Sequence, residues 1–505
     1  MHTLYSTAEI RRIEQTALAQ LPPYTLMQRA GQAASIAALR LLPDRPHKAR
    51  ILVLAGPGNN GGDALEAAVQ LNKAGADVVA LVQADIAHLP PDAANALARA
   101  IKAGVHIMPS EQFFTIDSIQ WTLVIDGLLG IGVKRPLDGE LRSLVATVNT
   151  FNCPVLALDV PTGLDADTGM VVGPDGVAII AVGTITFIAD KAGLHTGDGA
   201  DYAGKVEVAT LDIPPSSLSA AHSWLSSPAL FQQYLQPRAR NSNKGSYGNV
   251  AIIGGAHGMA GAAILAARAA AKSGAGKVMI GFLDQPPAYD NHQPELMCHH
   301  AEDIPLLTAS LVVGPGLGTD QAAHTLLINT LTAHSPLVLD ADALNLIAAE
   351  PALLQLVAQR RHSALYTIMT PHPLEAARLL NSSVTECQAD RLSAARALAQ
   401  RYNAIVVLKG AGSIIAHPDG RIAVNPTGNP GLATAGSGDV LAGICGALLA
   451  QGWDDWHAAI AAVWLHGSAA DSLVSQGFGP IGLTASELIP AVRSVLNELV
   501  ENITK

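Results

Sequence analysis

RILVLAGPGNNGGDALEAAVQLNKAGADVVAL, residues Arg50 to Leu81, reads as a buried strand, a glycine-rich turn, an alanine-rich helix and a second strand. Continuous apolar strands that alternate with helices are typical of a parallel sheet covered on both faces. WTLVIDGLLG (Trp121 to Gly130) and CPVLALDVPTG (Cys153 to Gly163) predict two more such strands, each ending in an aspartate where glycines begin. Ligands of such sheets bind at the carboxyl ends of the strands. We therefore expect one crevice to gather the polar residues that follow these strands, which are Asn59, Asn60, Asp63, Asp126 and Asp159.

The amino-acid composition changes at the end of this first half. The stretch DIPPSSLSAAHSWLSS (212–227) holds two prolines and several serines but no long apolar run, which indicates a connector. Strands and helices alternate again from GNVAIIGG (248–255), and DGRIAVNP (419–426) reads as the return strand of a hairpin. The predicted fold is α/β, with an N-terminal Rossmann-like doubly wound sheet and a second α/β domain. We expect domains over residues 1–215 and 228–505, joined by a linker over 216–227.

Composition narrows the class of function. The 505 residues allow two to four domains at about 150 residues each. Lys and Arg number 31 against 42 Asp and Glu, so the net charge is −11, and aromatic residues are only 4%, which argues against nucleic acid as the main partner. No apolar run is long enough for a membrane helix, the N-terminus has no secretory pattern, and the four cysteines lack zinc or disulfide spacing. These features favour a cytoplasmic enzyme that acts on small molecules.

Three motifs of the first half carry chemistry. GPGNNGGD (56–63) follows a strand and opens a helix, where glycines allow close approach to a ligand and helix-start amides attract anions. The loop is neither a Walker A motif nor a dinucleotide fingerprint, and alone it could be a tight structural turn. Lys134 and Arg135 could hold phosphate or lie on a solvated loop, and Asp159 could merely cap a turn. Three carboxylates at strand ends are costly to bury without a role, so together the motifs favour a functional crevice.

Together these motifs resemble the YjeF N-terminal family, the NAD(P)H-hydrate epimerases, over about residues 1–215, although Ala64 stands where that family usually has glycine. The resemblance implies interconversion of the R and S epimers of hydrated NADH or NADPH, with Asp159 as the acid/base residue and Asp126 as the second choice. It also implies a potassium ion held by Asn60, Asp126 and Thr162, whose oxygens suit a hard cation. The implied substrate-binding residues are Asn59, Asn60, Gly61, Gly62, Asp63, Gly130, Ile131, Gly132, Val133, Lys134, Arg135, Pro136 and Asp159.

The strongest signal in the second half is NPTGNPGLATAGSGDVLAG (425–443). Its GSGD run, Gly436 to Asp439, opens an apolar helix, so backbone amides converge beside the positive end of the helix dipole. Such a cradle suits a transferring phosphoryl group, and Asp439 could take the proton of an attacking hydroxyl. His372, in TPHP, follows a predicted strand, but a lone histidine is more often structural. Lys409, in KGAGS, follows another buried strand.

The GSGD run resembles the ribokinase-like superfamily. Within it, the motifs KGSYG, AGAA, PELM, GPGLG, DADALN, TPHP and KGAGS are similar to the YjeF C-terminal family, the ADP-dependent NAD(P)H-hydrate dehydratases, over about residues 228–500. The resemblance implies a ribokinase-like α/β sandwich that dehydrates the S epimer to NADH or NADPH at the expense of ADP, giving AMP and phosphate. The implied contacts to the hydrate are Ala262, Gly316, His372 and Asp439. The implied contacts to ADP are Lys409, Gly410, Ala411, Gly412, Ser413, Asn429, Gly436, Ser437 and Gly438.

A bifunctional repair mechanism follows from the two resemblances. Asp439 would deprotonate the C6 hydroxyl of the S hydrate for phosphorylation, and Mg²⁺ would bridge the nucleotide phosphates, after which phosphate leaves. The expected partners are the hydrates and ADP, with no nucleic acid or membrane, and we expect a homo-oligomer. Two other interpretations remain open: a small-molecule kinase of the ribokinase superfamily that phosphorylates a vitamin precursor, and a first half that is only a binding or assembly module.

Overall fold

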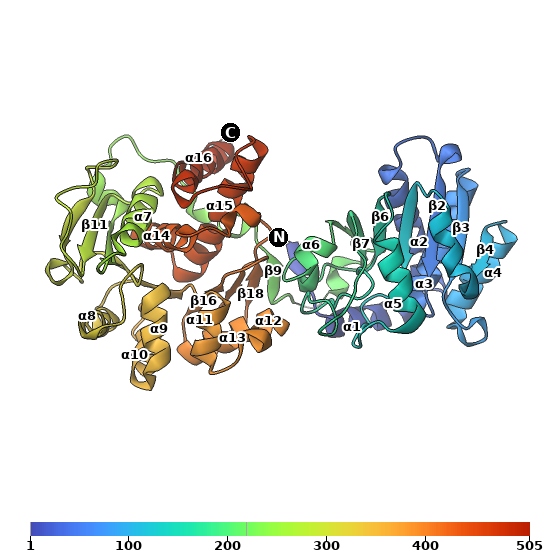
Figure 1. The fold of residues 1–505 in the computed structure, drawn as a ribbon, viewed down its shortest axis with the longest axis horizontal. Helices are drawn as coiled ribbons and strands as arrows, with labels where there is room; N and C mark the ends of the chain where they lie inside the picture. Colours follow the sequence, from blue (N-terminus) through green and yellow to red (C-terminus); the bar gives the residue numbers. More distant parts are fainter. Residues whose placement is uncertain (1, 219, 505) are drawn as a thin grey trace. The chain divides into compact units, whose positions relative to one another are not determined.

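Two compact units make up the chain in a computed structural model that describes residues 2–218 and 220–504 (Figure 1). One unit covers Thr3–Ser223, and the other covers the chain from Trp224 onward together with His2. The boundary lies in the proline- and serine-containing segment whose sequence indicates a connector. Each unit is an α/β structure with its own parallel sheet, which confirms the predicted fold class.

The Thr3–Ser223 unit contains a seven-stranded sheet in the order β4-β3-β2-β5-β6-β7-β8, in which every neighbouring pair is parallel. The strands are β2 (Arg50–Ala55), β3 (Asp77–Val82), β4 (His106–Pro109), β5 (Leu123–Gly127), β6 (Val155–Leu158), β7 (Gly183–Phe187) and β8 (Lys205–Ala209). The helices are α1 (Thr7–Leu18), α2 (Thr25–Leu41), α3 (Asn59–Lys73), α4 (Pro91–Lys102), α5 (Gly139–Val148) and α6 (Gly199–Tyr202).

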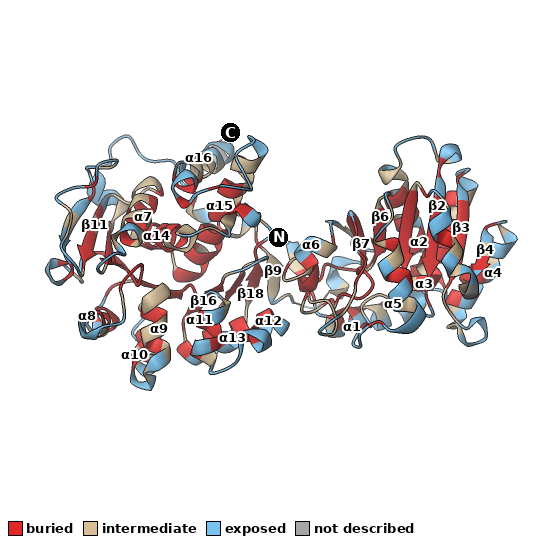
Figure 2. Ribbon diagram, viewed as in Figure 1, coloured by how far each residue is buried: buried red, intermediate tan, exposed pale blue. Residues whose placement is uncertain are grey.

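Strand β2 shows why its sequence forms a central strand. Successive side chains of a strand point to opposite faces of the sheet. Ile51 and Val53 join the core formed with helices α1 to α4, whereas Leu52 and Leu54 join a second core that includes residues of α5. All four are 0% exposed, so both faces are covered, and the continuous apolar run is the signature of that burial (Figure 2).

The order of these strands places a crevice beside β2. The chain proceeds from β2 outward through β3 and β4, then returns to add β5, β6, β7 and β8 on the other side. Ligands bind at such a topological switch point, outside the carboxyl ends of the strands. The loops after β2 and β5 meet there so closely that a Cβ on Gly56 would lie 1.7 Å from the Leu128 carbonyl oxygen.

The second unit is built on an eleven-stranded sheet in the order β1-β9-β18-β17-β16-β15-β14-β13-β10-β11-β12. The strands are β1 (His2–Leu4), β9 (Ser223–Leu225), β10 (Asn249–Gly254), β11 (Lys277–Phe282), β12 (Met297–His300), β13 (Ser310–Val313), β14 (Leu337–Leu339), β15 (Thr367–Met369), β16 (Ile405–Leu408), β17 (Ile414–Ala416) and β18 (Ile422–Val424). Strands β10 to β16 pair in parallel, while β17 and β18 form the predicted hairpin.

Helices cover both faces of this sheet. One face packs against α7 (Ala260–Lys272), α14 (Ser437–Ala450), α15 (Asp455–Ser475) and α16 (Ala485–Thr504) in a single hydrophobic core. On the other side lie α8 (Gln321–Thr332), α9 (Ala341–Ala349), α10 (Pro351–His362), α11 (Pro373–Leu380), α12 (Val384–Ala389) and α13 (Arg391–Tyr402) (Figure 1). Helices α7 and α14 approach so closely that a Cβ on Gly443 would lie 2.1 Å from the Ala266 carbonyl oxygen, which explains the small residues of both helices.

This sheet also has a switch point, between β10 and β13. The loop after β10 and the GPGLG loop after β13 join there, where the Gly255 amide donates to the Pro315 carbonyl and the Ala256 amide to the Gly316 carbonyl. The amino end of α14, which carries the GSGD run, belongs to the same unit. The sequence patterns therefore place a candidate site in each unit by the same topological rule.

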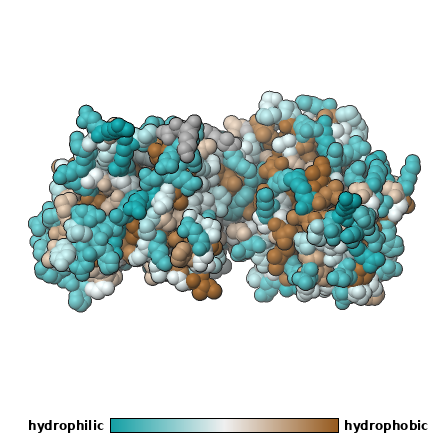
Figure 3. Space-filling model, turned by 90° about the horizontal axis from the view of Figure 1, so that it is seen from above, coloured by the Kyte–Doolittle hydropathy of each residue, from teal (hydrophilic) through white to brown (hydrophobic). Residues whose placement is uncertain are grey.

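The exposed surface is ordinary for a folded protein. One face of the molecule shows hydrophilic side chains over most of its area, with hydrophobic residues between them (Figure 3). In the part of the chain that the structure describes, no single helix combines the length and apolar character needed to span a membrane. Only the bent pair α9 and α10 meets that test when its two helices are taken together.

Candidate active sites

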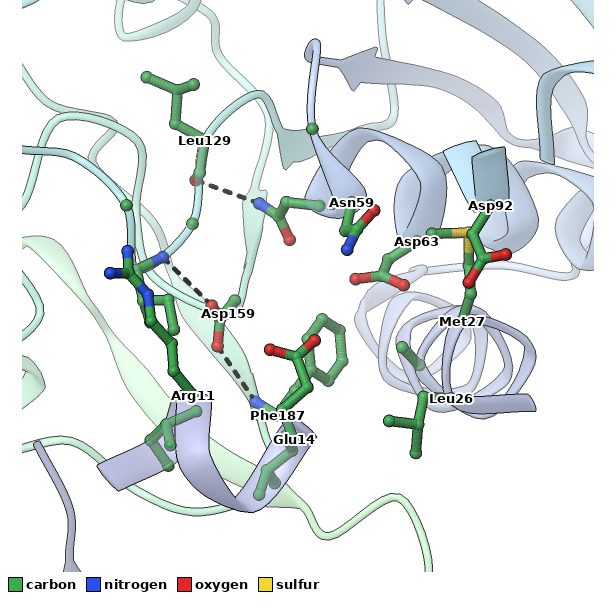
Figure 4. A pocket seen from close by; sticks show the side chains of 18 of the residues that line it. Arg11, Glu14, Leu26, Met27, Asn59, Asp63, Asp92, Leu129, Asp159 and Phe187 are labelled. Atoms are coloured by element: carbon green, nitrogen blue, oxygen red, sulfur yellow. Dashed lines mark hydrogen bonds between the residues drawn. The ribbon is translucent and has the colours of Figure 1, made fainter. Parts of the chain in front are cut away.

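The first candidate site is a cavity of about 470 Å³ at the switch point of the Thr3–Ser223 unit (Figure 4). Residues of α1, α2 and the start of α3 line it together with the loops after β2, β5, β6 and β7. Eight of the predicted residues line it, namely Asn59, Asn60, Asp63, Gly130, Ile131, Gly132, Val133 and Asp159.

Other predicted residues lie outside the cavity lining. Gly61 and Gly62 are buried in the helix start, where a Cβ on Gly61 would lie 2.0 Å from the Gly56 carbonyl oxygen. Lys134, for which the sequence left phosphate binding and a solvated loop both open, pairs with Asp165 at 2.9 Å, and Arg135 and Pro136 are exposed. The basic pair is therefore not directed into this cavity.

Asp126 and Thr162 form a buried hydrogen-bonded pair behind the cavity wall. The Thr162 hydroxyl donates to Asp126 Oδ1 at 2.7 Å and the Thr162 amide to Oδ2 at 2.8 Å, and both residues are 0% exposed. Burial raises the pKa of Asp126 to about 6, although hydrogen bonds from Thr162 and Leu128 oppose the shift. The Asp126 carboxyl group is therefore shielded from water.

Asn60 adds an oxygen without a partner. Its Nδ2 donates to the carbonyls of Leu129 and Leu158, both at 3.1 Å, while its Oδ1 is buried and has no hydrogen bond in the described part of the chain. Buried polar atoms are rarely left unsatisfied. A carboxylate, a hydroxyl and an orphaned amide oxygen form a donor set that fits a hard cation such as potassium.

Asp159 lies directly after β6 in a left-handed backbone conformation, with φ of 64°. Its Oδ1 accepts from Lys191 Nζ at 2.6 Å, and its Oδ2 accepts from the Ile131 amide at 3.3 Å. Lys191 is fully buried and also donates to the Thr186 hydroxyl and the Phe187 carbonyl. Sequence reasoning missed Lys191, although it follows the end of β7 and the strand-end rule could have found it.

Three more carboxyl groups line the same cavity, those of Glu14, Asp63 and Asp92. Glu14 comes from α1 and Asp63 from α3, and both point toward the space beside Asp159 (Figure 4). Burial raises the pKa of Asp63 well above its usual value, and the charges of Asp159, Glu14 and Asp92 act in the same direction. Burial and Asp159 also raise the pKa of Glu14. No local motif marks Glu14 as a site residue, because tertiary packing alone brings α1 to the cavity.

The second candidate site centres on Lys409, at the end of β16. Its Nζ lies 2.9 Å from Asp340 Oδ1, and the same oxygen accepts from the Thr370 hydroxyl at 2.7 Å. These residues follow the adjacent strands β16, β14 and β15. Burial lowers the pKa of Lys409, but Asp340 and Glu375 outweigh this effect and raise it. The lysine is therefore a buried cation at the carboxyl edge of the sheet.

The GSGD run lies against this ion pair. Gly436 caps α14 with φ of 87°, and a Cβ on Gly438 would lie 3.3 Å from Lys409 Nζ and 3.9 Å from Asp340 Oδ2. A side chain at Gly438 would fill the space beside the lysine, so the helix start and the cation share one anion-binding cradle. Burial, together with Asp340, raises the pKa of Asp439 to about 7, even though Lys409 opposes the shift. A carboxyl with such a pKa can accept a proton near neutral pH.

His372 caps the start of α11. Its Nδ1 accepts from the amides of Leu374 and Glu375 and thereby caps α11, while the Glu375 carboxylate accepts from the His372 amide at 2.8 Å. The ring is half-exposed, and burial together with Lys409 lowers its pKa. His372 therefore presents a neutral ring at the edge of the site.

The remaining predicted residues fall into separate groups. Ala262 and Gly316 adjoin, because a Cβ on Gly316 would lie 3.3 Å from the Ala262 Cβ. In KGAGS, the Ser413 hydroxyl donates to the Gly410 carbonyl, and Gly410 has φ of 146°. Asn429 donates to Asp471 of α15, which fixes the loop before the GSGD run. Ala411 and Gly412 lie in the same KGAGS loop, and Ser437 is the first residue of α14.

Two buried residues near these loops were not predicted. Arg391 of α13 is 2% exposed, and its guanidinium donates to the Leu408 and Lys409 carbonyls. His466 of α15 is buried with Nε2 unpaired in the described part of the chain, and burial lowers its pKa to about 4. Their helix sequences give no site signal, since Arg391 is the first residue of α13 and His466 lies within the apolar helix α15.

Comparison with known proteins matches both units. The model of the family described as NAD(P)H-hydrate dehydratase matches residues 250–492, and that of the YjeF-related protein N-terminus matches residues 23–193. The bifunctional NAD(P)H-hydrate repair enzyme Nnr of Coxiella burnetii is 39% identical over 508 residues, which cover 98% of this chain and 100% of that protein. The protein of the same name from Escherichia coli is 38% identical, covering 98% and 94% of the two chains.

Solved structures match the second unit. The ADP/ATP-dependent NAD(P)H-hydrate dehydratase from Bacillus subtilis, co-crystallised with ATP and Mg²⁺, is 31% identical to this chain. It covers 54% of this chain and 97% of its own, with a TM-score of 0.47.

Proposed function

This chain belongs to the family of bifunctional NAD(P)H-hydrate repair enzymes, and on that premise we propose which residues perform each half of the repair. The N-terminal domain is the epimerase, which interconverts the R and S hydrates of NADH and NADPH. The C-terminal domain is the dehydratase, which returns the S hydrate to NADH or NADPH at the expense of ADP, giving AMP and phosphate. The observation that carries the assignment of residues is the presence of a separate carboxylate-bearing site at the switch point of each unit.

In the epimerase, Asp159 is the acid/base residue. Its Oδ2 borders the cavity beside Gly130, since a Cβ on Gly130 would lie 2.9 Å from that oxygen. The hydrated ring would lie between the loop of residues 130–133 and the Asp63 carboxyl, while the amides that open α3 at Asn59 and Asn60 would receive a phosphate of the substrate. Lys134, Arg135 and Pro136 could contact only the outer part of a substrate that extends beyond the cavity.

Asn60, Asp126 and Thr162 would hold a potassium ion behind this wall. When bound, the cation would neutralise the buried Asp126 carboxylate and engage the orphaned Asn60 oxygen. The same residues connect to the cavity walls, because Asn60 donates to Leu129 and the Leu129 amide donates to the Thr162 hydroxyl. Filling this site would therefore stabilise the loop that carries Gly130.

In the dehydratase, Asp439 accepts the proton of the C6 hydroxyl of the S hydrate. The amides of the GSGD run and Lys409 receive the phosphoryl group that passes to that hydroxyl. Loss of phosphate from C6 together with a proton from C5 then restores the dihydronicotinamide. Ala262, Gly316 and His372 would border the hydrate, and the loops of Lys409–Ser413 and Asn429–Gly438 would border ADP.

Magnesium would be held chiefly by the nucleotide phosphates. In the described residues, no cluster of three or more His, Cys, Asp or Glu side chains could hold a metal ion by itself. Mg²⁺ commonly binds through substrate phosphates and one or two carboxylates, and Asp340 and Asp439 lie beside the cradle.

One experiment tests this division of labour. The full chain is incubated with mixed R and S hydrates, with and without ADP, while each epimer and the phosphate released are followed. We expect both epimers to disappear with ADP in the wild type, and Asp439→Asn to abolish dehydration while epimers still interconvert. Equal loss of both activities in a folded Asp439→Asn chain would contradict the two-site assignment. A stable phosphorylated product would favour the kinase interpretation instead.

The other expectations follow from the substrates. We propose a cytoplasmic location, where nicotinamide nucleotides and ADP are available, and an assembly of identical subunits, which size measurement in solution would test. The residues of the cradle suit the phosphates of either ADP or ATP, so the choice of nucleotide requires direct comparison of the two.

A further inference from the structure

The epimerase cavity contains more carboxyl groups than nucleotide binding explains. Glu14, Asp63 and Asp159 come from three different segments and point into one space (Figure 4). A nicotinamide dinucleotide carries a negatively charged pyrophosphate, so every ionised carboxylate in its cavity weakens binding through repulsion. Since these carboxyl groups do not favour binding of the substrate, we expect at least one of them to take part in the reaction.

Asp159 and Asp63 differ sharply in their surroundings. The carboxylate of Asp159 is paired with the buried Lys191 ammonium at 2.6 Å and also receives backbone amides. Asp63, in contrast, has neither a hydrogen bond nor a cationic partner in the described part of the chain. The titratable groups acting on it are the acids Asp159, Glu14 and Asp92, on the loop after β6, on α1 and on α4.

The two carboxyl groups therefore lie in contrasting environments. Since burial and three negative neighbours all disfavour its charge, the pKa of Asp63 lies well above its usual value. Asp159 has a buried ammonium in direct contact, which stabilises its charge. A pair of carboxyls of which one is held by an ammonium and the other has no partner is an arrangement suited to acid–base chemistry.

We propose that Asp63 is a second catalytic residue of the epimerase, which donates a proton to the C6 hydroxyl of the hydrate while Asp159 accepts a proton from the water that replaces it. Lys191 is a positioning residue that holds Asp159 through Oδ1 and leaves Oδ2 toward the cavity. This inference rests on the proposed epimerase function, and it deepens that function by naming the proton donor.

The chemistry balances without a further reactant. The Asp63 proton moves to the C6 hydroxyl, the C6–O bond breaks, and the ring nitrogen lone pair forms a C6=N1 double bond as water leaves. Water then adds to C6 from the opposite face, the π electrons return to nitrogen, and one water proton passes to Asp159. Asp63 is now ionised and Asp159 protonated, which is the starting state for the reverse conversion. Proton exchange with solvent through the open cavity, whose rim residues Arg11 and Asn59 are exposed, restores the first state.

The proposal distinguishes this route from opening of the ring. If the ring opened at the C6–N1 bond, the oxygen on C6 would stay attached during inversion. Loss and return of water, in contrast, exchanges that oxygen with solvent at each inversion. The oxygen isotope in the inverted product therefore reports directly on the step assigned to Asp63.

The test uses the full chain without ADP, so that dehydration does not consume the S epimer. Purified R hydrate is incubated in ¹⁸O-labelled water, and the rate of S formation and its isotope content are measured by chromatography and mass spectrometry. We expect the S product of the wild type to carry solvent oxygen. Asp63→Asn should lower kcat by about 100-fold or more, the usual scale for removing a general acid, with KM changed less than about threefold.

Matched variants separate this role from a structural one. Asp63→Glu should restore part of the lost rate, and Asp44→Asn, which removes an exposed carboxyl of the same unit outside the cavity lining, should keep the rate within about threefold. ADP-dependent dehydration of S hydrate by the same chains reports that the second unit is intact, and thermal unfolding reports on the first.

The outcomes are distinguishable. Inversion by wild type no faster than the uncatalysed reaction would refute the proposed epimerase and this inference with it. Catalysed inversion that retains the original oxygen, or a folded Asp63→Asn chain with wild-type kcat, would refute this inference alone.

Discussion

The dehydratase should lose activity in acid because its base is ionised only near and above neutral pH. The pKa of Asp439 is raised to about 7, mainly by burial and by the negative charge of Asp340. The base must be ionised to accept the hydroxyl proton, so activity falls as pH falls through that value. The pH dependence of kcat/KM reports on the free enzyme, which is the state that the structure describes.

The magnitude follows from simple titration. With a pKa of about 7, about nine-tenths of the Asp439 carboxyls are ionised at pH 8 and about one-tenth at pH 6. We therefore expect kcat/KM for the S hydrate to fall by about tenfold between these values. The assay follows the return of dihydronicotinamide absorbance at saturating ADP and low hydrate concentration.

Asp340→Asn provides the sharper test, because it removes a like charge and frees Lys409 to act on Asp439. At an effective dielectric constant of about 20, two unit charges interact by about 4 kcal/mol at about 4 Å and by less at greater separation or in salt. A downward shift of the midpoint by about one pH unit is a moderate expectation on that scale. Epimerisation by the same variant serves as the control, since its site lies in the other unit. An upward shift, or a wild-type rate that is flat from pH 6 to 8, would refute the reasoning.

Three other substitutions or conditions test the remaining assignments. Asp159→Ala should reduce epimer exchange to the uncatalysed rate while ADP-dependent dehydration of pure S hydrate continues; exchange at the wild-type rate would favour the binding-module interpretation. Potassium should raise the melting temperature of the wild type above that in sodium at pH 8, because Asp126, with a pKa of about 6, is ionised there. Differential scanning fluorimetry should show a smaller increase for Asp126→Asn. An equal increase in the variant would argue against this site. Gly410→Ala would place a Cβ 2.5 Å from the Arg391 guanidinium. We therefore expect KM for ADP to rise by about tenfold or more, with little change in KM for the hydrate. An unchanged KM for ADP in steady-state kinetics would contradict the role of this loop.

Much of the architecture could be predicted because its determinants are local. Apolar runs mark the buried strands, and the local pair Ser6 and Glu9 forms a capping box at the start of α1. The hairpin at Asp419 and Gly420 also forms as its turn residues indicate. Strand-end aspartates fall near the switch points because parallel strands share one carboxyl edge.

The remaining parts of the sites depend on tertiary structure. Glu14 reaches the cavity only because α1 packs beside it, and no property of the α1 sequence predicts that position. From the sequence, Lys134 could be a phosphate ligand or a residue of a solvated loop, and folding brings it to Asp165 and Asp167, which are its ion-pair partners. Charge on a loop identifies a residue that needs a partner, whereas the fold decides whether that partner is a ligand or a neighbouring side chain.

Each unit has a hydrophobic core and a chemical centre of its own, yet both are translated as one polypeptide. Gene expression therefore cannot alter the stoichiometry of the two catalysts, which is fixed at one to one in every cell. Any imbalance between supply of the S epimer and its consumption has to be corrected by changing turnover numbers, through substitutions such as those around Asp63 or Asp439, and not by making more of one partner.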